Sequence, residues 1–281
     1  MASPAIEKQI PVDINEPTRN RLLDELKSTW AYRELLGFLV WRDVKVRYKQ
    51  TVLGVSWAIL QPLLTMVVFT IFFGNFAQIP SDDLPYPIFN FAALVPWTYF
   101  TAALNSASTS LVASSNMLKK IYFPRMVLPL SGVITGLVDM SLSFSMLILL
   151  CFAFGVSIAP TFIFLPLFVL MAMLTALGFG MWLSVLNVQF RDVRFAMPFI
   201  INLWLFITPV IYPTSIIDEQ WRWLLSLNPM VSVIEGFRWA LLGSGNAPDG
   251  TIFISLGVIL FLVVTGTIYF NRSEGFFADV V

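Results

Sequence analysis

Long stretches without a charged residue constrain this chain more than any other feature of its sequence. Five occur: 32 residues at 50–81, 35 at 84–118, 65 at 126–190 with Asp139 as the one interruption, 23 at 195–217, and 22 at 250–271. Because an α-helix rises 1.5 Å per residue, about 20 apolar residues cross the hydrocarbon of a bilayer. The chain is 57% hydrophobic and 12% charged, about half the charge density of an average soluble domain. We therefore expect an all-α integral membrane protein.

The 65-residue stretch is long enough for two helices, and a turn between Gly155 and Pro160 would join them as a hairpin. This interpretation predicts six transmembrane helices, at about 53–75, 88–114, 128–153, 161–186, 196–213 and 251–271. They belong to one transmembrane domain at 31–281. It follows an N-terminal extension at 1–30 that contains no apolar run typical of a secretory signal.

The distribution of Lys and Arg predicts the orientation of these helices. If both termini are cytoplasmic, 15 of the 17 basic residues lie on the cytoplasmic side, and only Arg222 and Arg238 lie outside. Basic residues accumulate in cytoplasmic loops of membrane proteins. We expect a multi-pass protein of the inner (cytoplasmic) membrane with both termini inside the cell.

Residues 33–50 predict an amphipathic helix that lies in the cytoplasmic interface and does not cross the membrane. Its side chains form two groups at 100° per residue: Leu36, Val40, Trp41, Val44 and Tyr48 on the apolar side, and Arg42, Lys45 and Lys49 on the basic side. Arg47 lies near the apolar side and makes the pattern imperfect. A helix of a small soluble N-terminal domain is the alternative.

Three further segments differ from plain spans. The segment 116–129 predicts a short helix and a turn, and 187–198 lies at the membrane edge; from the residues alone, each is either a solvated loop or a docking surface. Their charged residues are Lys119, Lys120, Arg125, Arg191, Asp192 and Arg194. The apolar stretch 231–242 follows Asn228-Pro229, carries Glu235 and Arg238, and is too short to cross. It predicts a re-entrant pair of half-helices before the last span.

The sequence offers little catalytic chemistry. It contains no histidine and a single cysteine, Cys151, which removes the commonest general base and any disulfide or thiolate-metal cluster. No phosphate-binding G-x-x-x-x-G-K-[ST] motif is present, so we expect no catalytic, cofactor or metal site in this chain. The net charge of zero does not suggest a nucleic-acid partner.

Asp139 is the only charge deep within a predicted span, and intramembrane carboxylates are costly and often functional. A hydrogen-bonded structural aspartate between helices is the alternative, because no other span offers a charged partner. Gly132 and Gly136, four residues apart, would let another helix approach closely, as in a dimer motif; a chance pair in an apolar sequence is the alternative.

Four segments together resemble the ABC-2-type permeases of polysaccharide exporters, which include O-antigen, capsule and teichoic-acid transporters. They are RDVKVRYKQTVLGVSWAILQPL (42–63), NMLKKIYFPRMVLPLS (116–131), LNVQFRDVRFAMPFIINLWLFITPVIYP (186–213) and NPM (228–230). The resemblance covers roughly residues 30–271.

The resemblance implies a homodimer with two copies of a separate ABC ATP-binding subunit, which would bind ATP and Mg. It implies that the helix at 33–50 is a gate helix whose Trp41, Arg42, Lys45, Tyr48 and Lys49 meet a lipid headgroup. The segments 116–129 and 187–198 would be coupling elements, and the half-helices with Glu235 and Arg238 would be a re-entrant gate. The substrate would be a polysaccharide linked to polyprenyl pyrophosphate.

Other functions remain to be compared with this one. An ABC-2 permease for a drug or another lipid would share the architecture. An ion-coupled secondary transporter would need paired intramembrane charges and an internal repeat, neither of which the sequence contains. A membrane-embedded glycosyl- or acyltransferase would need an acid–base constellation that is also missing.

The predicted topology can be tested by cysteine labelling. In a Cys151→Ser background, we expect cysteines at Ser81 and Asn246 to react with a membrane-impermeant maleimide outside intact cells, and a cysteine at Ser273 to react only after permeabilisation. External labelling of Ser273→Cys would mean an odd number of spans.

Overall fold

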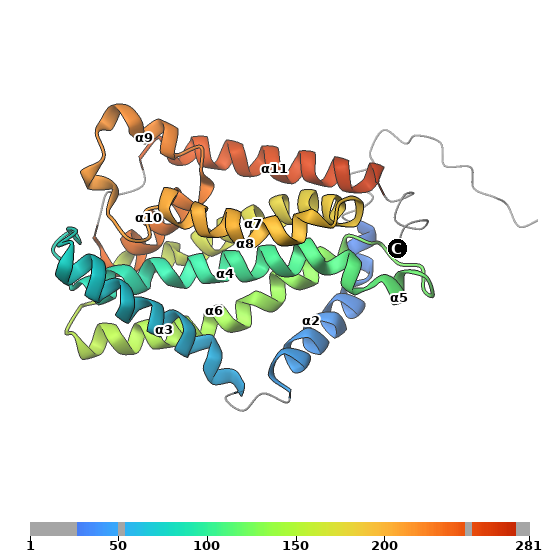
Figure 1. The fold of residues 1–281 in the computed structure, drawn as a ribbon, viewed down its shortest axis with the longest axis horizontal. Coiled ribbons are helices and arrows are strands. Elements are labelled where there is room, and N and C mark those ends of the chain that lie inside the picture. Colours follow the sequence, from blue (N-terminus) through green and yellow to red (C-terminus); the bar gives the residue numbers. More distant parts are fainter. Residues whose placement is uncertain (1–26, 50–53, 245–248, 274–281) are drawn as a thin grey trace, which may run out of the picture.

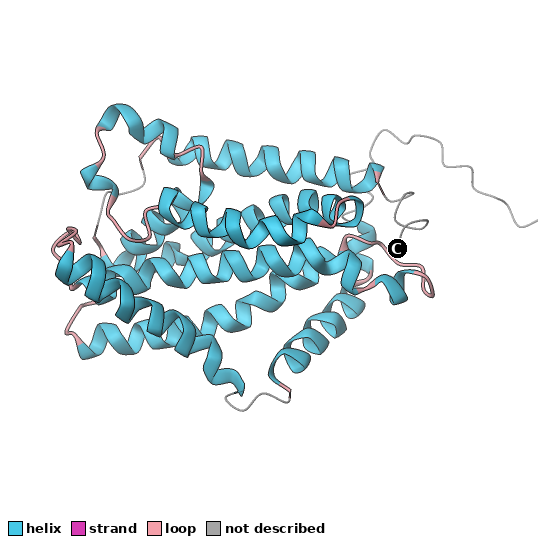
Figure 2. Cartoon of the chain, viewed as in Figure 1, coloured by secondary structure: helices cyan, strands magenta, loops and turns pink. Residues whose placement is uncertain are grey.

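A computed structural model describes residues 27–49, 54–244 and 249–273. Within these ranges the chain is helical with no β-strand (Figure 2). In chain order the helices are α2 (Arg33–Tyr48), α3 (Trp57–Phe69), α4 (Tyr86–Ala113), α5 (Ser115–Leu118), α6 (Val127–Ala153), α7 (Leu165–Gln189), α8 (Asp192–Ile207), α9 (Glu219–Leu225), α10 (Pro229–Leu242) and α11 (Ile252–Arg272). Residues 1–26 of the predicted extension and the labelling position Asn246 lie outside the described residues.

Five helical stretches are long and apolar enough to cross a membrane: Gly54–Phe76, Tyr86–Ala113, Val127–Ala153, Pro160–Gln189 and Ile252–Arg272. The first joins α3 to a π-helical segment at Thr70–Phe76, and the fourth joins a short 3-10 turn at Pro160–Phe164 to α7. These stretches show a multi-pass membrane protein. The segment predicted as the fifth span, 196–213, differs, because its helix α8 starts at Asp192 and ends at Ile207 after 16 residues.

The long helices run side by side, and α4 is the centre of the bundle (Figure 1). Helix α4 is buried along most of its length and contacts α3, α6, α7 and α10, while α11 packs on the far side of α7. One end of the bundle carries α5, the α7–α8 junction and the end of α11; we call it the basic end. The opposite end carries α9, α10 and the α6–α7 turn, and we call it the α9–α10 end (Figure 1).

Two predicted local features are present in the structure. Helix α6 ends at Ala153, and the chain turns back at Gly155, whose φ of +69° is a backbone conformation that glycine adopts readily. Helix α10 begins after Asn228, whose side-chain oxygen accepts a hydrogen bond from the Met230 amide at 3.2 Å, with Pro229 at the first helical position. A proline there lacks only an amide hydrogen that the helix would not use.

Small residues bring three helices into close contact with their neighbours. A Cβ atom on Gly132 would lie 3.1 Å from the Ala107 backbone nitrogen, and one on Gly136 would lie 3.1 Å from the Tyr99 ring, so both glycines face α4 of the same subunit. Gly178 of α7 and Gly266 of α11 let these two helices approach each other closely. A Cβ on Gly266 would lie 2.9 Å from the Gly178 carbonyl oxygen. Close van der Waals packing of this kind holds helices together where lipid removes the hydrophobic driving force.

Arg238 of α10 holds the α9–α10 end together. Its guanidinium donates to three backbone carbonyls: Nε to Phe89 at 3.1 Å, Nη1 to Pro209 at 2.8 Å and Nη2 to Val210 at 2.8 Å. The guanidinium also stacks over the Phe89 ring, 3.6 Å from its centroid. Because α8 ends at Ile207, the carbonyls of Pro209 and Val210 have no helical partner, and Arg238 supplies the donors they need.

The contact between α7 and α11 predicts different outcomes for two glycines on one helix. Gly266→Ala should destabilise the protein by about 1–3 kcal/mol, because the new methyl group would meet a backbone oxygen that cannot move alone. Gly257→Ala on the same helix is the control, since no atom lies within 4 Å of the added Cβ. Thermal unfolding of both variants in detergent would measure the difference, and equal melting temperatures would contradict the packing.

The carbonyl network predicts that Arg238→Leu lowers the free energy of unfolding by about 2–5 kcal/mol, because it leaves buried acceptors without donors. Arg222→Leu on α9 is the matched control: its ion pair with the exposed Glu219 is 4.0 Å long, and such pairs contribute about 0–1 kcal/mol. Thermal unfolding in detergent checks both. An Arg238→Leu variant as stable as Arg222→Leu would show that the carbonyls find other donors.

Candidate functional site

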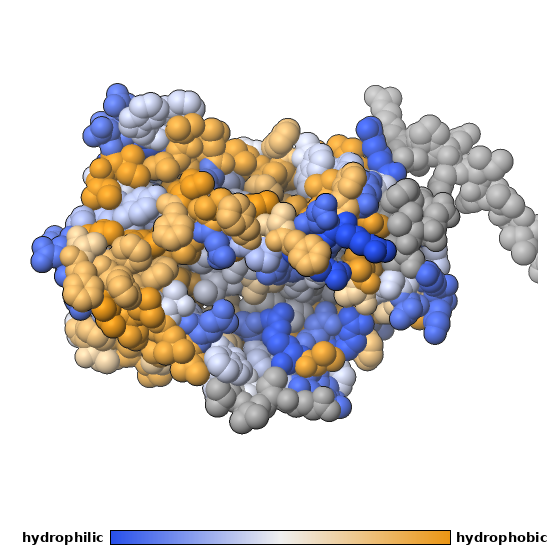
Figure 3. All heavy atoms as spheres, viewed as in Figure 1, coloured by the Kyte–Doolittle hydropathy of each residue, from blue (hydrophilic) through white to orange (hydrophobic). Residues whose placement is uncertain are grey.

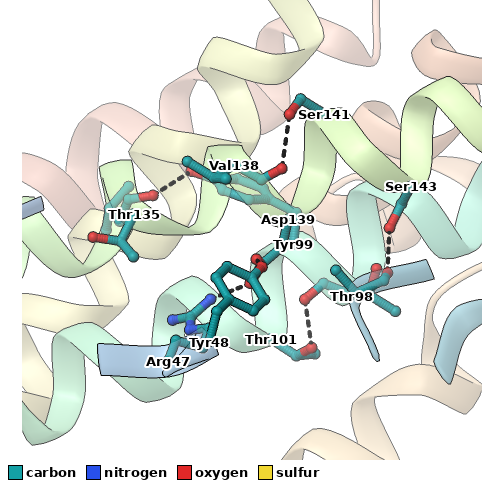
Figure 4. A network of polar contacts seen from close by, with 12 residues as sticks. Arg47, Tyr48, Thr98, Tyr99, Thr101, Thr135, Val138, Asp139, Ser141 and Ser143 are labelled. Carbon is teal, nitrogen blue, oxygen red and sulfur yellow. Dashed lines mark hydrogen bonds and ion pairs between the residues drawn. The ribbon is translucent and has the colours of Figure 1, made fainter. Parts of the chain in front are cut away.

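Asp139 lies midway along α6, and its carboxylate binds two side chains of the last turn of α2 (Figure 4). Oδ2 accepts a hydrogen bond from Nη1 of Arg47 and forms an ion pair with it, and Oδ1 accepts a hydrogen bond from the Tyr48 hydroxyl. Among the described residues this is the only ion pair that joins segments distant in sequence. Burial, followed by the hydrogen bond to Asp139, raises the pKa of the Tyr48 hydroxyl, so Tyr48 stays a donor.

A groove of about 290 Å³ adjoins Asp139 between α3, α4 and α6. Its lining combines hydrogen-bonding side chains with two aromatic ones: Gln61, Thr98, Thr101, Asn105, Asp139 and Ser143, together with Trp57 and Tyr99. Figure 3 shows hydrophilic atoms in a hollow on this face, between apolar surfaces. Donors, acceptors and aromatic faces without a cluster of like charges suit an uncharged, hydroxyl-rich ligand.

Packing between the three helices fixes the walls of the groove. Ser143 of α6 donates a hydrogen bond to the Ala58 carbonyl of α3 at 2.8 Å. Tyr99 of α4 lies against Gly136, and its hydroxyl donates to the Val133 carbonyl of α6 at 3.2 Å. Because these bonds tie α6 to both neighbours, the position of Asp139 is set by the bundle as well as by α2.

The basic residues predicted on α2 lie close to one another, but their partners differ. Arg42 pairs with its neighbour Asp43 at 2.8 Å, Lys49 is exposed, and the Lys45 ammonium lies 4.5 Å from the centroid of the Trp41 ring. The sequence pattern grouped Trp41 with the apolar side, whereas the structure leaves it 58% exposed beneath Lys45. The fully buried anchor of α2 is Leu39.

The predicted coupling residues gather at the basic end. Lys119, Lys120 and Arg125 line a shallow depression of about 220 Å³, together with Tyr122, which is 93% exposed. Arg191, Asp192 and Arg194 lie at the α7–α8 junction and are exposed. The segment 187–198 is therefore a break between two helices rather than a long loop.

Glu235 and Arg238 lie far from these residues, at the α9–α10 end (Figure 1). Glu235 lines a small cavity of about 40 Å³ with Arg222 and Asp249. Burial raises the pKa of Glu235 to about 7, although the charge of Arg238 opposes the shift. The residues predicted as functional thus occupy three separate places: the α2–α6 contact beside the groove, the basic end, and the α9–α10 end.

Arg47 and the groove are the parts of this candidate site that the sequence did not predict. Arg47 is a basic residue on the apolar side of α2, and Asp139 is the one charge in a run of 65 residues. Two opposite charges, each in an apolar setting, could have predicted this pair, because a charge removed from water requires a partner. The polar lining of the groove carried no such signal, since Thr, Ser, Asn and Gln are common in membrane helices.

Residues 34–242 match the model of the ABC-2 type transporter family. The chain is 33% identical to the O-antigen export system permease protein RfbA of Myxococcus xanthus over 261 residues, which cover 91% of this chain and 98% of that protein. It is 29% identical to the protein of the same name from Klebsiella pneumoniae, over 88% of this chain and 95% of that one. It is 22% identical to the polysialic acid transport protein KpsM of Escherichia coli, over 83% and 91%. The chain belongs to the ABC-2 type transporter family.

Proposed function

We propose that this chain is the membrane-spanning subunit of an ATP-driven exporter that moves a polysaccharide linked to polyprenyl pyrophosphate across the inner membrane. One observation carries the proposal: the likeness to an O-antigen export permease extends over 91% of this chain. The groove beside Asp139 supports it, because its uncharged polar groups and its two aromatic side chains suit sugar rings.

In this proposal α8 is the fifth of six spans. Its 16 residues extend about 24 Å, somewhat less than the hydrocarbon thickness, and the following turn completes the crossing. Such a turn is tolerated within a membrane only if its carbonyls are satisfied, and Arg238 satisfies those of Pro209 and Val210. Helix α8 also runs from the basic end toward the α9–α10 end, which supports an even number of crossings (Figure 1).

With both termini in the cytoplasm, the basic end would face the cytoplasm, and α9 with α10 would be the re-entrant pair on the outer side.

A second copy of the chain would complete the pathway. Helix α8 exposes a row of large apolar side chains that need lipid or a protein partner: Phe195, Phe199, Leu203 and Phe206. A second copy covering this row and α3 would enclose the hydrophilic hollow of Figure 3.

Two copies of an ATP-binding subunit would dock at the basic end, where exposed cations and the exposed Tyr122 offer charged and apolar contacts. When those subunits close upon ATP binding, the segments 115–126 and 190–194 would move with them as rigid bodies. The pyrophosphate of the substrate would meet Arg42, Lys45 and Lys49 on α2. No catalytic residue of this chain takes part, since hydrolysis would occur on the partner.

Export of another lipid or of a drug is the second candidate. The chain is 26% identical to the inner membrane transport permease YadH of Escherichia coli over 85% of its length. The name of that protein does not specify a polysaccharide as its substrate. The two candidates share the docking of the ATP-binding subunit and differ in the cargo.

Reversing charge at the α7–α8 junction tests the proposal. Arg191→Glu should weaken co-purification with the ATP-binding subunit by about tenfold and lower polysaccharide export in cells that lack their own permease, because attraction becomes repulsion at a small interface. Arg222→Glu, on α9 at the opposite end of the bundle, is a charge-matched control that should leave co-purification unchanged. Normal assembly and export by Arg191→Glu would show that this junction is not a docking surface. A wild-type chain that assembles with the ATP-binding subunit but exports no polysaccharide would favour the second candidate.

A further inference from the structure

Helix α2 packs on α6, and it does so through an apolar contact in its first half and a polar contact in its last turn. Leu39 is fully buried in the first half of α2, and Arg47 with Tyr48 binds Asp139 in its last turn. Most other large side chains along α2 are at least partly exposed; Phe38 and Trp41 are each 58% exposed. In the last turn of α2 the contact with α6 is therefore polar.

Asp139 belongs to two structures at once. Its carboxylate is the partner of α2, and the residue is also part of the wall of the groove between α3, α4 and α6. Arg47 and Tyr48 are not part of the groove lining. A displacement of the last turn of α2 would consequently leave a charged carboxylate facing the groove.

The environment of this contact differs from that of Arg238. The Arg238 residue is 4% exposed and donates to three carbonyls, so releasing it would leave a buried charge and buried acceptors unpaired. The side chains of Arg47 and Asp139 are 32% and 22% exposed, so the protein encloses neither charge as completely as it encloses Arg238. The contacts of Arg238 would therefore be costly to break, whereas the contact between Arg47 and Asp139 can open.

We propose that Arg47, Tyr48 and Asp139 form a releasable clasp that, when closed, holds α2 against α6 and that, when open, lets α2 move and turns the Asp139 carboxylate toward the groove. The three residues position α2 and do not bind the substrate. That the clasp gates transport rests on the proposed export function, whereas its control over the docking of α2 does not.

The docking of α2 can be measured without transport. In a Cys151→Ser background, Leu39→Cys places a thiol at a fully buried position of α2, and Leu241→Cys places one at an equally buried position of α10 as the control. The rate of reaction with a small hydrophilic maleimide is measured for the full chain in permeabilised cells. We expect Arg47→Gln or Asp139→Asn to raise the rate at Leu39→Cys by about tenfold, the effect of losing one charge-assisted contact.

Rescue distinguishes the clasp from a general loosening of the protein. The exchanged pair Arg47→Asp with Asp139→Arg should return the rate at Leu39→Cys to within about twofold of the parent, because the attraction is restored. Arg47→Lys should lie between the parent and Arg47→Gln, because one ammonium cannot reproduce the fork of a guanidinium. An unchanged rate in Arg47→Gln, or a parallel rise at Leu241→Cys, would overturn the proposal.

Export by the complex with the ATP-binding subunit tests the gating role. Arg47→Gln should lower export several-fold, and the exchanged pair should restore part of it. Raised labelling with wild-type export would overturn the gate. If the wild-type chain exports no polysaccharide but labelling responds as expected, the proposed function fails while the clasp remains.

Discussion

The need to satisfy every backbone polar group away from water shapes this protein more than any other constraint. Helices meet it by themselves along most of their length, and five stretches of the described chain are helical over enough residues to cross a membrane. Helix α8 does not, because it stops at Ile207 and leaves carbonyls without donors. Arg238 resolves this by donating to Pro209 and Val210 from α10. The architecture of the α9–α10 end thus depends on one guanidinium.

Two charged contacts within the bundle have opposite physical character. Arg238 is enclosed and bound by rigid backbone acceptors, and no carboxylate forms an ion pair with it among the described residues. Arg47 and Asp139 are partly exposed side chains on two different helices. The first arrangement stabilises a single structure, whereas the second, as we propose, opens and closes in a protein that alternates between states.

The sites lie at separate positions along the bundle, as expected if binding at one end is coupled to movement at another. The exposed cations of the basic end lie at one extremity, the groove lies within the helices, and Glu235 lies near the other extremity (Figure 1). Helices α7 and α8 reach from the basic end into the bundle, and close packing at Gly178 would transmit a displacement without much compression. Energy supplied at one end would in this way reach the groove through rigid elements.

The membrane character, the approximate limits of the five long helical stretches and the turn at Gly155 could all be predicted from the sequence, because they follow from charge-free length and local backbone preference. The sequence also located α2 and the start of α10, since a basic, aromatic-rich helix and an Asn-Pro pair are local signals. Three features required the folded structure: Gly132 and Gly136 face α4, α8 ends at Ile207 with Arg238 bound to the carbonyls that follow, and Asp139 pairs with Arg47. Each of these joins residues far apart in the chain, and their pairing depends on how the helices pack, which no local pattern encodes.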